Sequence, residues 1–266
     1  MLKVSKRFLD RAKTHLRRYQ KLLESAKARD VNESDTVVII TDFLADVLGY
    51  DKYSELTTEF AVRSTFCDLA IKVEGELQYL IEVKSAGTDL RDNHLRQAID
   101  YAANQGIEGV ILTNGSCWHV HRVYFEQPIR SEMVLSIDML DSGVKTAQLV
   151  RDLSLLSREA ACAGTMTKYW KQKEATSRFV VGQLLLAEPT LRLLSREIRV
   201  LSGGVRVAPE HLAELLRSEI LKRDVLEGER AEVAAKLVRR VTRRRAKAQE
   251  AHGPQSTAAA TVPAST

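Results

Sequence analysis

The sequence lacks several features that would identify a membrane-spanning, secreted or disulfide-bonded protein. No apolar run approaches the roughly 18 residues needed to cross a bilayer, and the basic N-terminus has no apolar segment typical of a secretory signal. The three cysteines, Cys67, Cys117 and Cys162, are an odd number and widely spaced, which argues against a disulfide framework or a zinc site. We therefore expect a cytoplasmic protein with reduced, mostly buried thiols and no membrane partner.

Repeats and nucleotide-binding motifs are also missing. The chain has neither an internal repeat nor a GxxxxGK[ST] phosphate-binding loop. Hydrophobic residues make up 44% of the 266 residues and charged residues 28%. Because these fractions are close to those of soluble globular chains, the composition excludes global disorder and a fibrous protein. The length suffices for one domain with a sizeable core and a smaller appendage.

Charge is distributed unevenly along the chain. Residues 1–30 carry ten Lys/Arg against three Asp/Glu, a net of +7, and residues 151–266 carry twenty-one against thirteen, a net of +8. Residues 31–150 carry nine against nineteen, a net of −10. An acidic centre with basic flanks suits a protein that gathers carboxylates for a metal while its flanks attract nucleic acid. Solvated helix faces would give the same charge pattern.

Hydrophobic periodicity predicts a mixed α/β domain followed by helices. Helical spacing predicts a basic amphipathic helix over about 2–29 and a second helix over 32–48, capped by Asn32 and ended by Gly49. Strands are expected at about 58–63, 66–73, 77–84, 109–113 and 118–124, with a helix over 89–105 and a turn at Asn114-Gly115. We expect a mixed β-sheet flanked by helices and divide the chain into a basic helix (1–30), an α/β domain (31–141), an all-α region (142–250) and a disordered tail (251–266).

The residues that suggest chemistry lie on two of the expected strands. Asp68 lies on one strand, and Glu82 and Lys84 lie two residues apart on the next, so both point to the same side. A short turn would bring Asp68 beside them. Two neighbouring carboxylates repel unless a cation lies between them, and Mg²⁺ binds through carboxylates, waters and phosphate oxygens. The alternative is that the three charged residues have no functional role and lie on a solvent-exposed edge strand, but the apolar residues around them argue against it.

These residues resemble a known motif set. Asp68, Glu82-Val83-Lys84, Gln97 and Tyr101 resemble the Asp, ExK and QxxxY motifs of the PD-(D/E)XK nuclease superfamily. More narrowly, the chain is similar over about residues 30–140 to the N-terminal nuclease domain of type I restriction enzyme R subunits. The segments that carry this similarity are Asn32-Glu33, Asp35-Thr36, Leu48-Gly49-Tyr50, Glu59, Leu112-Thr113-Asn114-Gly115 and Trp118.

The resemblance implies a restriction-endonuclease-like fold and Mg²⁺-dependent hydrolysis of DNA, with Mn²⁺ as a substitute, in a restriction or phage-defence setting. It implies that Asp68, Glu82 and the Val83 carbonyl bind the metal and that Lys84 is the catalytic lysine. Gln97 and Tyr101 would reach the site or a DNA phosphate, and Glu33 would assist at the metal. Whether Glu33, Asp35 or Glu59 completes the metal site stays open, because Glu33 and Asp35 also suit a helix N-terminus.

The chain departs from the R subunits in one respect: helices stand where those subunits continue into a DNA-translocating ATPase. ATP-dependent cleavage is therefore not implied, although an ATPase or specificity subunit on another chain and a homodimer are compatible partners. A run of arginines near the C-terminus suits phosphate contact or simply the end of a helix: Arg239, Arg240, Arg243, Arg244 and Arg245. The alternative function is a nucleic-acid-binding or assembly module that keeps the fold without cleaving.

Overall fold

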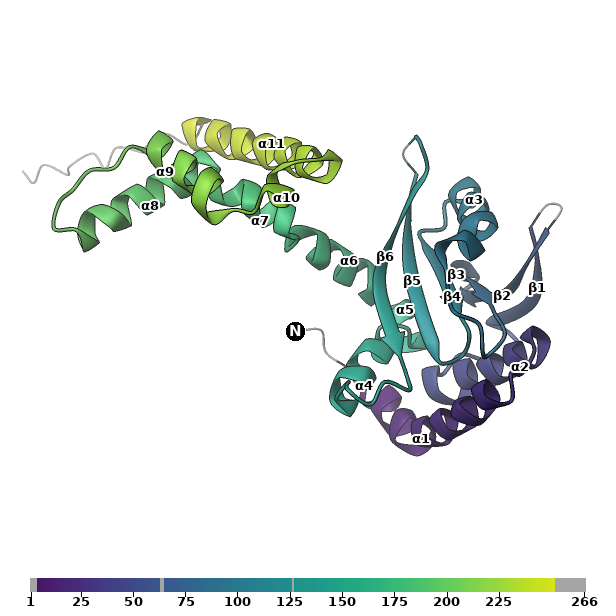
Figure 1. Cartoon of the computed structure of the whole chain (residues 1–266). Coiled ribbons are helices and arrows are strands. Elements are labelled where there is room, and N and C mark those ends of the chain that lie inside the picture. Colours follow the sequence, from purple (N-terminus) through teal and green to yellow (C-terminus); the bar gives the residue numbers. More distant parts are fainter. Residues whose placement is uncertain (1–3, 63–64, 126, 252–266) are drawn as a thin grey trace, which may run out of the picture. The chain divides into compact units, whose positions relative to one another are not determined.

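The computed structural model describes residues 4–62, 65–125 and 127–251, with side chains described except at 59–62, 65–66, 92, 97 and 249–251. The chain divides into two compact units, residues 1–171 and 172–266. The first unit contains the predicted mixed α/β sheet with flanking helices, and the second is helical (Figure 1). The tail expected to be disordered, from residue 252 onward, lies outside the described residues.

A six-stranded open sheet forms the centre of the first unit. Its strands follow one another in chain order: β1 (Leu56–Val62), β2 (Thr65–Val73), β3 (Glu76–Val83), β4 (Gly109–Thr113), β5 (Cys117–Tyr124) and β6 (Arg130–Asp138). Neighbouring strands are antiparallel except for β3 and β4, which are parallel. The five predicted strands are therefore present within two residues of their expected bounds, and the Asn114-Gly115 turn joins β4 to β5 as predicted.

The sixth strand, β6, was not predicted from the sequence. It pairs antiparallel with β5 along its whole length and contributes Val134, Leu135 and Ile137 to the buried core. Its polar first half, Arg130 to Glu132, interrupts the alternation of apolar and polar residues from which strands are inferred. Tertiary pairing, which the local pattern does not encode, determines this strand.

The parallel pairing of β3 with β4 requires a crossover, since a tight turn can join only antiparallel neighbours. A 3₁₀ turn, η2 (Asp92–Leu95), and helix α3 (Arg96–Gln105) provide it. Gly106 ends α3 with a φ of +70°, a left-handed conformation that favours glycine. Leu95 of η2 and Ala98 and Ala102 of α3 pack on the sheet face that contains Leu80 and Leu112.

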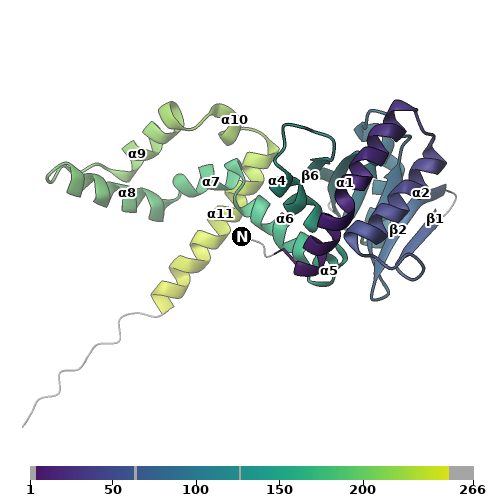
Figure 2. The same cartoon turned by 90° about the horizontal axis from the view of Figure 1, so that it is seen from below.

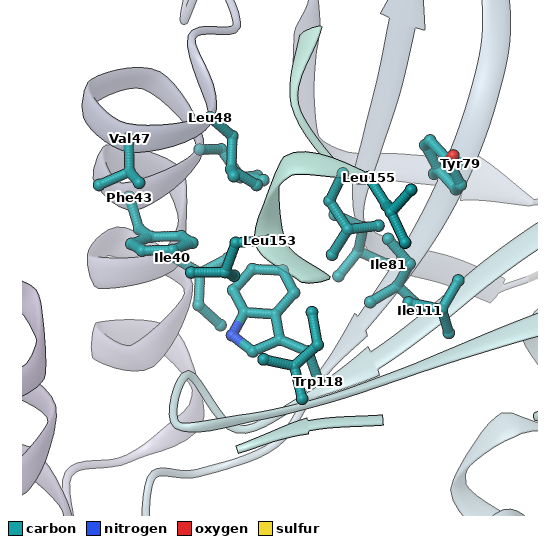
Figure 3. Close-up of a cluster of buried hydrophobic side chains, with 14 of the residues drawn as sticks. Ile40, Phe43, Val47, Leu48, Tyr79, Ile81, Ile111, Trp118, Leu153 and Leu155 are labelled. Atoms are coloured by element: carbon teal, nitrogen blue, oxygen red, sulfur yellow. The ribbon is translucent and has the colours of Figure 1, made fainter. Parts of the chain in front are cut away.

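The opposite face of the sheet is covered by two helices near the N-terminus, α1 (Lys6–Ala28) and α2 (Glu33–Phe43), the latter continuing as a π-helical turn, η1 (Leu44–Leu48) (Figures 1 and 2). The Asn32 side chain accepts a hydrogen bond from the Asp35 backbone N–H, which confirms the predicted cap. Trp118 lies at the centre of this core, with its ring 5.5 Å from that of Phe43 (Figure 3). The apolar side of α1 is part of the same core through Phe8, Ala12, Leu16, Tyr19 and Leu23.

The first unit extends beyond the boundary expected at residue 141. Helices α4 (Thr146–Ser154) and α5 (Arg158–Cys162) belong to it, and so does most of α6 (Thr165–Ala175). Leu149, Leu153 and Leu155 are buried in the core that α1 and α2 form on the sheet (Figure 3). The expected separate regions 1–30 and 142–171 therefore share one hydrophobic core with the sheet, because each has an apolar helix face that packs into it.

The second unit consists of helices that form small buried clusters. Its elements are α7 (Arg178–Leu185), α8 (Glu188–Leu201), α9 (Pro209–Leu215), η3 (Leu216–Ile220), α10 (Arg223–Leu226) and α11 (Glu229–Ala251). Leu191, Leu212 and Leu216 form one buried cluster, and Val180 with Val238 belong to another. Among the described helices of either unit, none is long and apolar enough to span a membrane.

The three cysteines are free, as expected, but they differ in burial. Cys67 is buried, Cys117 is half-buried and Cys162 is exposed at the end of α5. The prediction of mostly buried thiols is therefore wrong for Cys162, because the short helix α5 turns Ala160 rather than its last residue toward the core.

Candidate functional site

Asp68, Glu82 and Lys84 come together where β2 and β3 lie side by side. The antiparallel register pairs Leu69 with Ile81, which places the next residues of the two strands, Asp68 and Glu82, beside each other. Lys84 follows the last residue of β3, and its backbone N–H donates a hydrogen bond of 2.8 Å to the Thr113 carbonyl of β4. The backbone is thus fixed on both sides of these residues. The expected convergence of the three side chains is present.

Asp68 is held by a backbone hydrogen bond. Its Oδ2 accepts from the Val83 N–H at 2.7 Å, the one hydrogen bond of this carboxylate within the described residues. Burial raises the pKa of Asp68 above its usual range, although the hydrogen bond from Val83 and the charge of Lys84 oppose the shift. Oδ2 is oriented by the strand beside it, and Oδ1 is available to a ligand.

Lys84 bridges two carboxylates. Its Nζ lies 2.8 Å from Glu82 Oε1 and 3.4 Å from Glu33 Oε2. The side chains of Lys84 and Glu82 are only 19% and 21% exposed, whereas Glu33 is 48% exposed. Burial raises the pKa of Glu82. For Lys84, burial acts to lower the pKa, but the hydrogen bond to Glu82 and the charges of the nearby carboxylates outweigh it, so the pKa is raised and the side chain is a cation at neutral pH.

Glu33, rather than Asp35, is the acidic residue of α2 that reaches the site. Both lie in the first turn of the helix, where a negative charge is favoured. The Asp35 side chain accepts a hydrogen bond of 3.1 Å from Asn32 Nδ2 and so belongs to the helix cap. Glu33 instead pairs with Lys84. Of the alternatives left open by the sequence, the described side chains favour Glu33, while the Glu59 side chain lies outside the described residues.

The charged residues lie next to an apolar cluster. Glu82 shares one face of β3 with Leu80, which packs with Cys67, Leu95 and Leu112 beneath α3. Burial and the neighbouring Glu82 and Asp68 raise the pKa of Cys67 to about 12, and its thiol donates a hydrogen bond to the Ile81 carbonyl. Cys67 is therefore a structural thiol rather than a nucleophile at neutral pH.

The remaining predicted site residues are less closely tied to this cluster. Tyr101 is half-buried on α3 and packs against the apolar cluster on the same face of the sheet as Glu82. The Gln97 side chain lies outside the described residues, so its role stays a prediction. The predicted nucleic-acid-binding arginines, Arg239, Arg240, Arg243, Arg244 and Arg245, are exposed on α11 of the second unit.

The chemistry of the donor set fits a hard divalent cation bound by two carboxylates. Asp68 and Glu82 supply adjacent oxygen ligands that are partly withdrawn from water, and Mg²⁺ usually keeps several waters besides one or two carboxylates. In the part of the chain that the structure describes, no group of three or more His, Cys, Asp or Glu is arranged to hold a metal. Glu33 pairs with Lys84, and both its part in a metal site and ligation by the Val83 carbonyl stay predictions.

Two backbone groups that position the site were missed at the sequence level. The Val83 N–H orients Asp68, and the Thr113 carbonyl fixes the backbone of Lys84. Neither role depends on side-chain identity, so only the predicted pairing of the three strands could have indicated them. No known protein family, curated protein or solved structure matches the chain.

Proposed function

We propose that the chain is a Mg²⁺-dependent deoxyribonuclease of the PD-(D/E)XK type, acting in restriction or phage defence. The observation that carries the proposal is the convergence of Asp68, Glu82 and Lys84, half-buried, at neighbouring positions of two paired strands. Burying three charges costs stability, so their presence together indicates a functional role. The order of elements, two helices, three antiparallel strands, a helix and a strand parallel to β3, supports the restriction-endonuclease-like fold that the resemblance implies.

The residues of this site have distinct tasks in the proposed reaction. Asp68 and Glu82 would hold the cation, which when bound supplies Lewis acidity at the scissile phosphate. The ammonium of Lys84 donates hydrogen bonds and positive charge, so it orients the attacking water and offsets the negative charge that develops on the phosphate. The pKa of Lys84 is raised by the neighbouring carboxylates, so its ammonium carries the positive charge that this role needs. Glu33 holds the ammonium beside the carboxylates.

A second candidate is a nucleic-acid-binding or assembly module that keeps this fold without cleaving. One observation favours it: Lys84 pairs with both Glu82 and Glu33, so part of the negative charge of the site is offset without a metal. Both candidates predict DNA binding that weakens with salt. They differ in whether products form with a divalent cation and whether Lys84 is needed for them.

The experiment is incubation of the purified chain with supercoiled plasmid and linear single-stranded DNA in Mg²⁺, Mn²⁺ or EDTA. Lys84→Ala is run beside it, with Lys52→Ala, an exposed surface lysine, as the matched control. The proposal predicts metal-dependent products from the unaltered chain and from Lys52→Ala, and at least a 100-fold loss in Lys84→Ala with DNA binding retained. Binding without products in every condition supports the module, and equal products from all three proteins contradict the proposed site.

A further inference from the structure

The exposed side of α1 is a row of basic side chains. Lys13, Arg17 and Lys21 follow one another at intervals of four residues and therefore lie on one side of the helix. All three are exposed, and the opposite side of α1 is buried in the core of the first unit. The row is thus displayed by a helix that cannot rotate without exposing the core.

These three side chains have no structural task in the described part of the molecule. None forms a hydrogen bond or an ion pair there, although Asp10 and Glu24 lie one turn before and one turn after the row. Arg11, on another side of the same helix, is fully engaged with Glu159 and two backbone carbonyls. Like charges four residues apart disfavour a helix by a few tenths of a kcal/mol each, and an anionic ligand would reverse this effect.

The C-terminal end of α1 is joined by hydrogen bonds to the segment that follows Lys84. Beyond the end of α1, the Val31 N–H donates to the Ala26 carbonyl, and the Val31 carbonyl accepts from Ala86, two residues after Lys84. Glu33, which pairs with Lys84, follows directly. The C-terminal end of α1 and the site residues therefore belong to one hydrogen-bonded segment of the same compact unit.

From these observations we infer that the Lys13–Arg17–Lys21 face of α1 binds the phosphate backbone of duplex DNA and directs it to the Asp68–Glu82–Lys84 site. The row is about 12 Å long, from a rise of about 1.5 Å per residue, and one DNA strand carries a phosphate every 3.4 Å or so of its axis. The three cations thus match three or four phosphates. Insertion of this helix into a bilayer is disfavoured, because the apolar side that would enter it is buried in the protein.

The test is binding of a fluorescent 30-base-pair DNA duplex by the full chain in EDTA, as a function of NaCl concentration. The triple variant Lys13→Gln, Arg17→Gln, Lys21→Gln is compared with Arg206→Gln, Arg217→Gln, Lys222→Gln, which removes the same charge at exposed positions of the second unit. Each lost phosphate contact lowers affinity by about eightfold at 0.1 M salt and reduces the slope of log K against log salt by about 0.9. We expect a slope about 2.7 smaller for the α1 variant and an unchanged slope for the control variant.

Circular dichroism checks that the α1 variant is folded, since substitutions at exposed positions should leave the spectrum and the melting curve unchanged. Binding by the α1 variant with the affinity and slope of the unaltered chain would overturn the inference. So would binding of an RNA duplex of the same length but not of DNA. The inference rests on the proposed function for its choice of partner, but the two are read out separately. Reduced DNA binding by the α1 variant, with no plasmid cleavage by the unaltered chain, would refute the nuclease and support the DNA-binding face. Plasmid cleavage by the unaltered chain, with unchanged binding by the α1 variant, would support the nuclease and refute the DNA-binding face.

Discussion

Asp68 illustrates at the residue scale how the site is maintained at a cost in stability. Its carboxyl group is half-buried, and burial makes the charged form less favourable in the folded chain than in the unfolded chain. Because the folded pKa is raised, the unfolded chain releases this proton at lower pH than the folded chain. The contribution of Asp68 to the free energy of unfolding is therefore largest in acid, below both pKa values. It declines as the pH rises from the pKa of the unfolded state to that of the folded state.

Asp68→Asn should accordingly stabilise the protein at pH 7. The amide oxygen can still accept the Val83 N–H, and no buried charge remains. We expect the melting temperature at pH 7 to rise by about 2–4 °C, the change that about 1 kcal/mol produces in a chain of this length, and the gain to shrink as pH falls below 4 or so, where the unfolded carboxyl is protonated. Thermal melts followed by circular dichroism at both pH values provide the measurement. An equal or larger gain in acid would contradict the raised pKa.

The sequence predicted part of this residue-scale arrangement. The ExK spacing placed Glu82 and Lys84 on one side of β3, and strand pairing predicted Asp68 beside them. The pairing of Glu33 with Lys84 could not be derived from spacing, since it depends on where the N-terminus of α2 lies relative to the end of β3.

At the scale of elements, α1 is a core helix rather than a basic arm. Its position is fixed at one point by Arg11, whose guanidinium forms two hydrogen bonds with Glu159 of α5 and donates to the Val47 and Leu48 carbonyls at the end of η1. Burial acts to raise the pKa of Glu159, but the hydrogen bonds from Arg11 outweigh it and lower the pKa. One side chain thus links three helical elements.

Arg11→Met should therefore destabilise the fold. It leaves Glu159 and two carbonyls of the helix end without a partner, and each such loss costs about 1–3 kcal/mol when the group stays out of water. Because both side chains are about a quarter exposed, water will replace part of the loss, and we expect about 2 kcal/mol in total by urea denaturation. Arg7→Met, an exposed change on the same helix, should lie within about 0.5 kcal/mol of the unaltered chain. Equal stabilities of the two variants would refute the role of Arg11.

The elements differ in how well the sequence predicted them. The buried strand β4 was predicted with its exact bounds, because an apolar run between Gly106 and Asn114-Gly115 has clear ends. β6 was missed because its first half is polar. The apolar side of α1 was visible as periodicity, but the surface that buries it was not, since periodicity identifies a face and not its partner.

At the scale of the whole molecule, the first unit should fold without the second. Its core includes α1, the sheet and residues 149–156, and it ends within α6. A chain truncated after Ala175, which retains α6 complete, should melt cooperatively. A chain truncated after Asp141 loses Leu149, Leu153, Leu155 and Leu156 from the core and should expose enough apolar surface to aggregate. Cooperative melting of both chains would contradict the boundary at residue 171.

The central claim is that Asp68 and Glu82 together bind a divalent cation. It is tested most directly by titrating Mn²⁺ into the chain and measuring free Mn²⁺ by electron paramagnetic resonance, which requires neither DNA nor a partner. The Asp68→Asn, Glu82→Gln variant is compared with Asp141→Asn, Glu76→Gln, which removes the same charges at exposed positions. We predict at least a tenfold weaker affinity in the first variant and an unchanged affinity in the second. Equal binding by both variants, or no binding by the unaltered chain at millimolar Mn²⁺, would contradict the metal site.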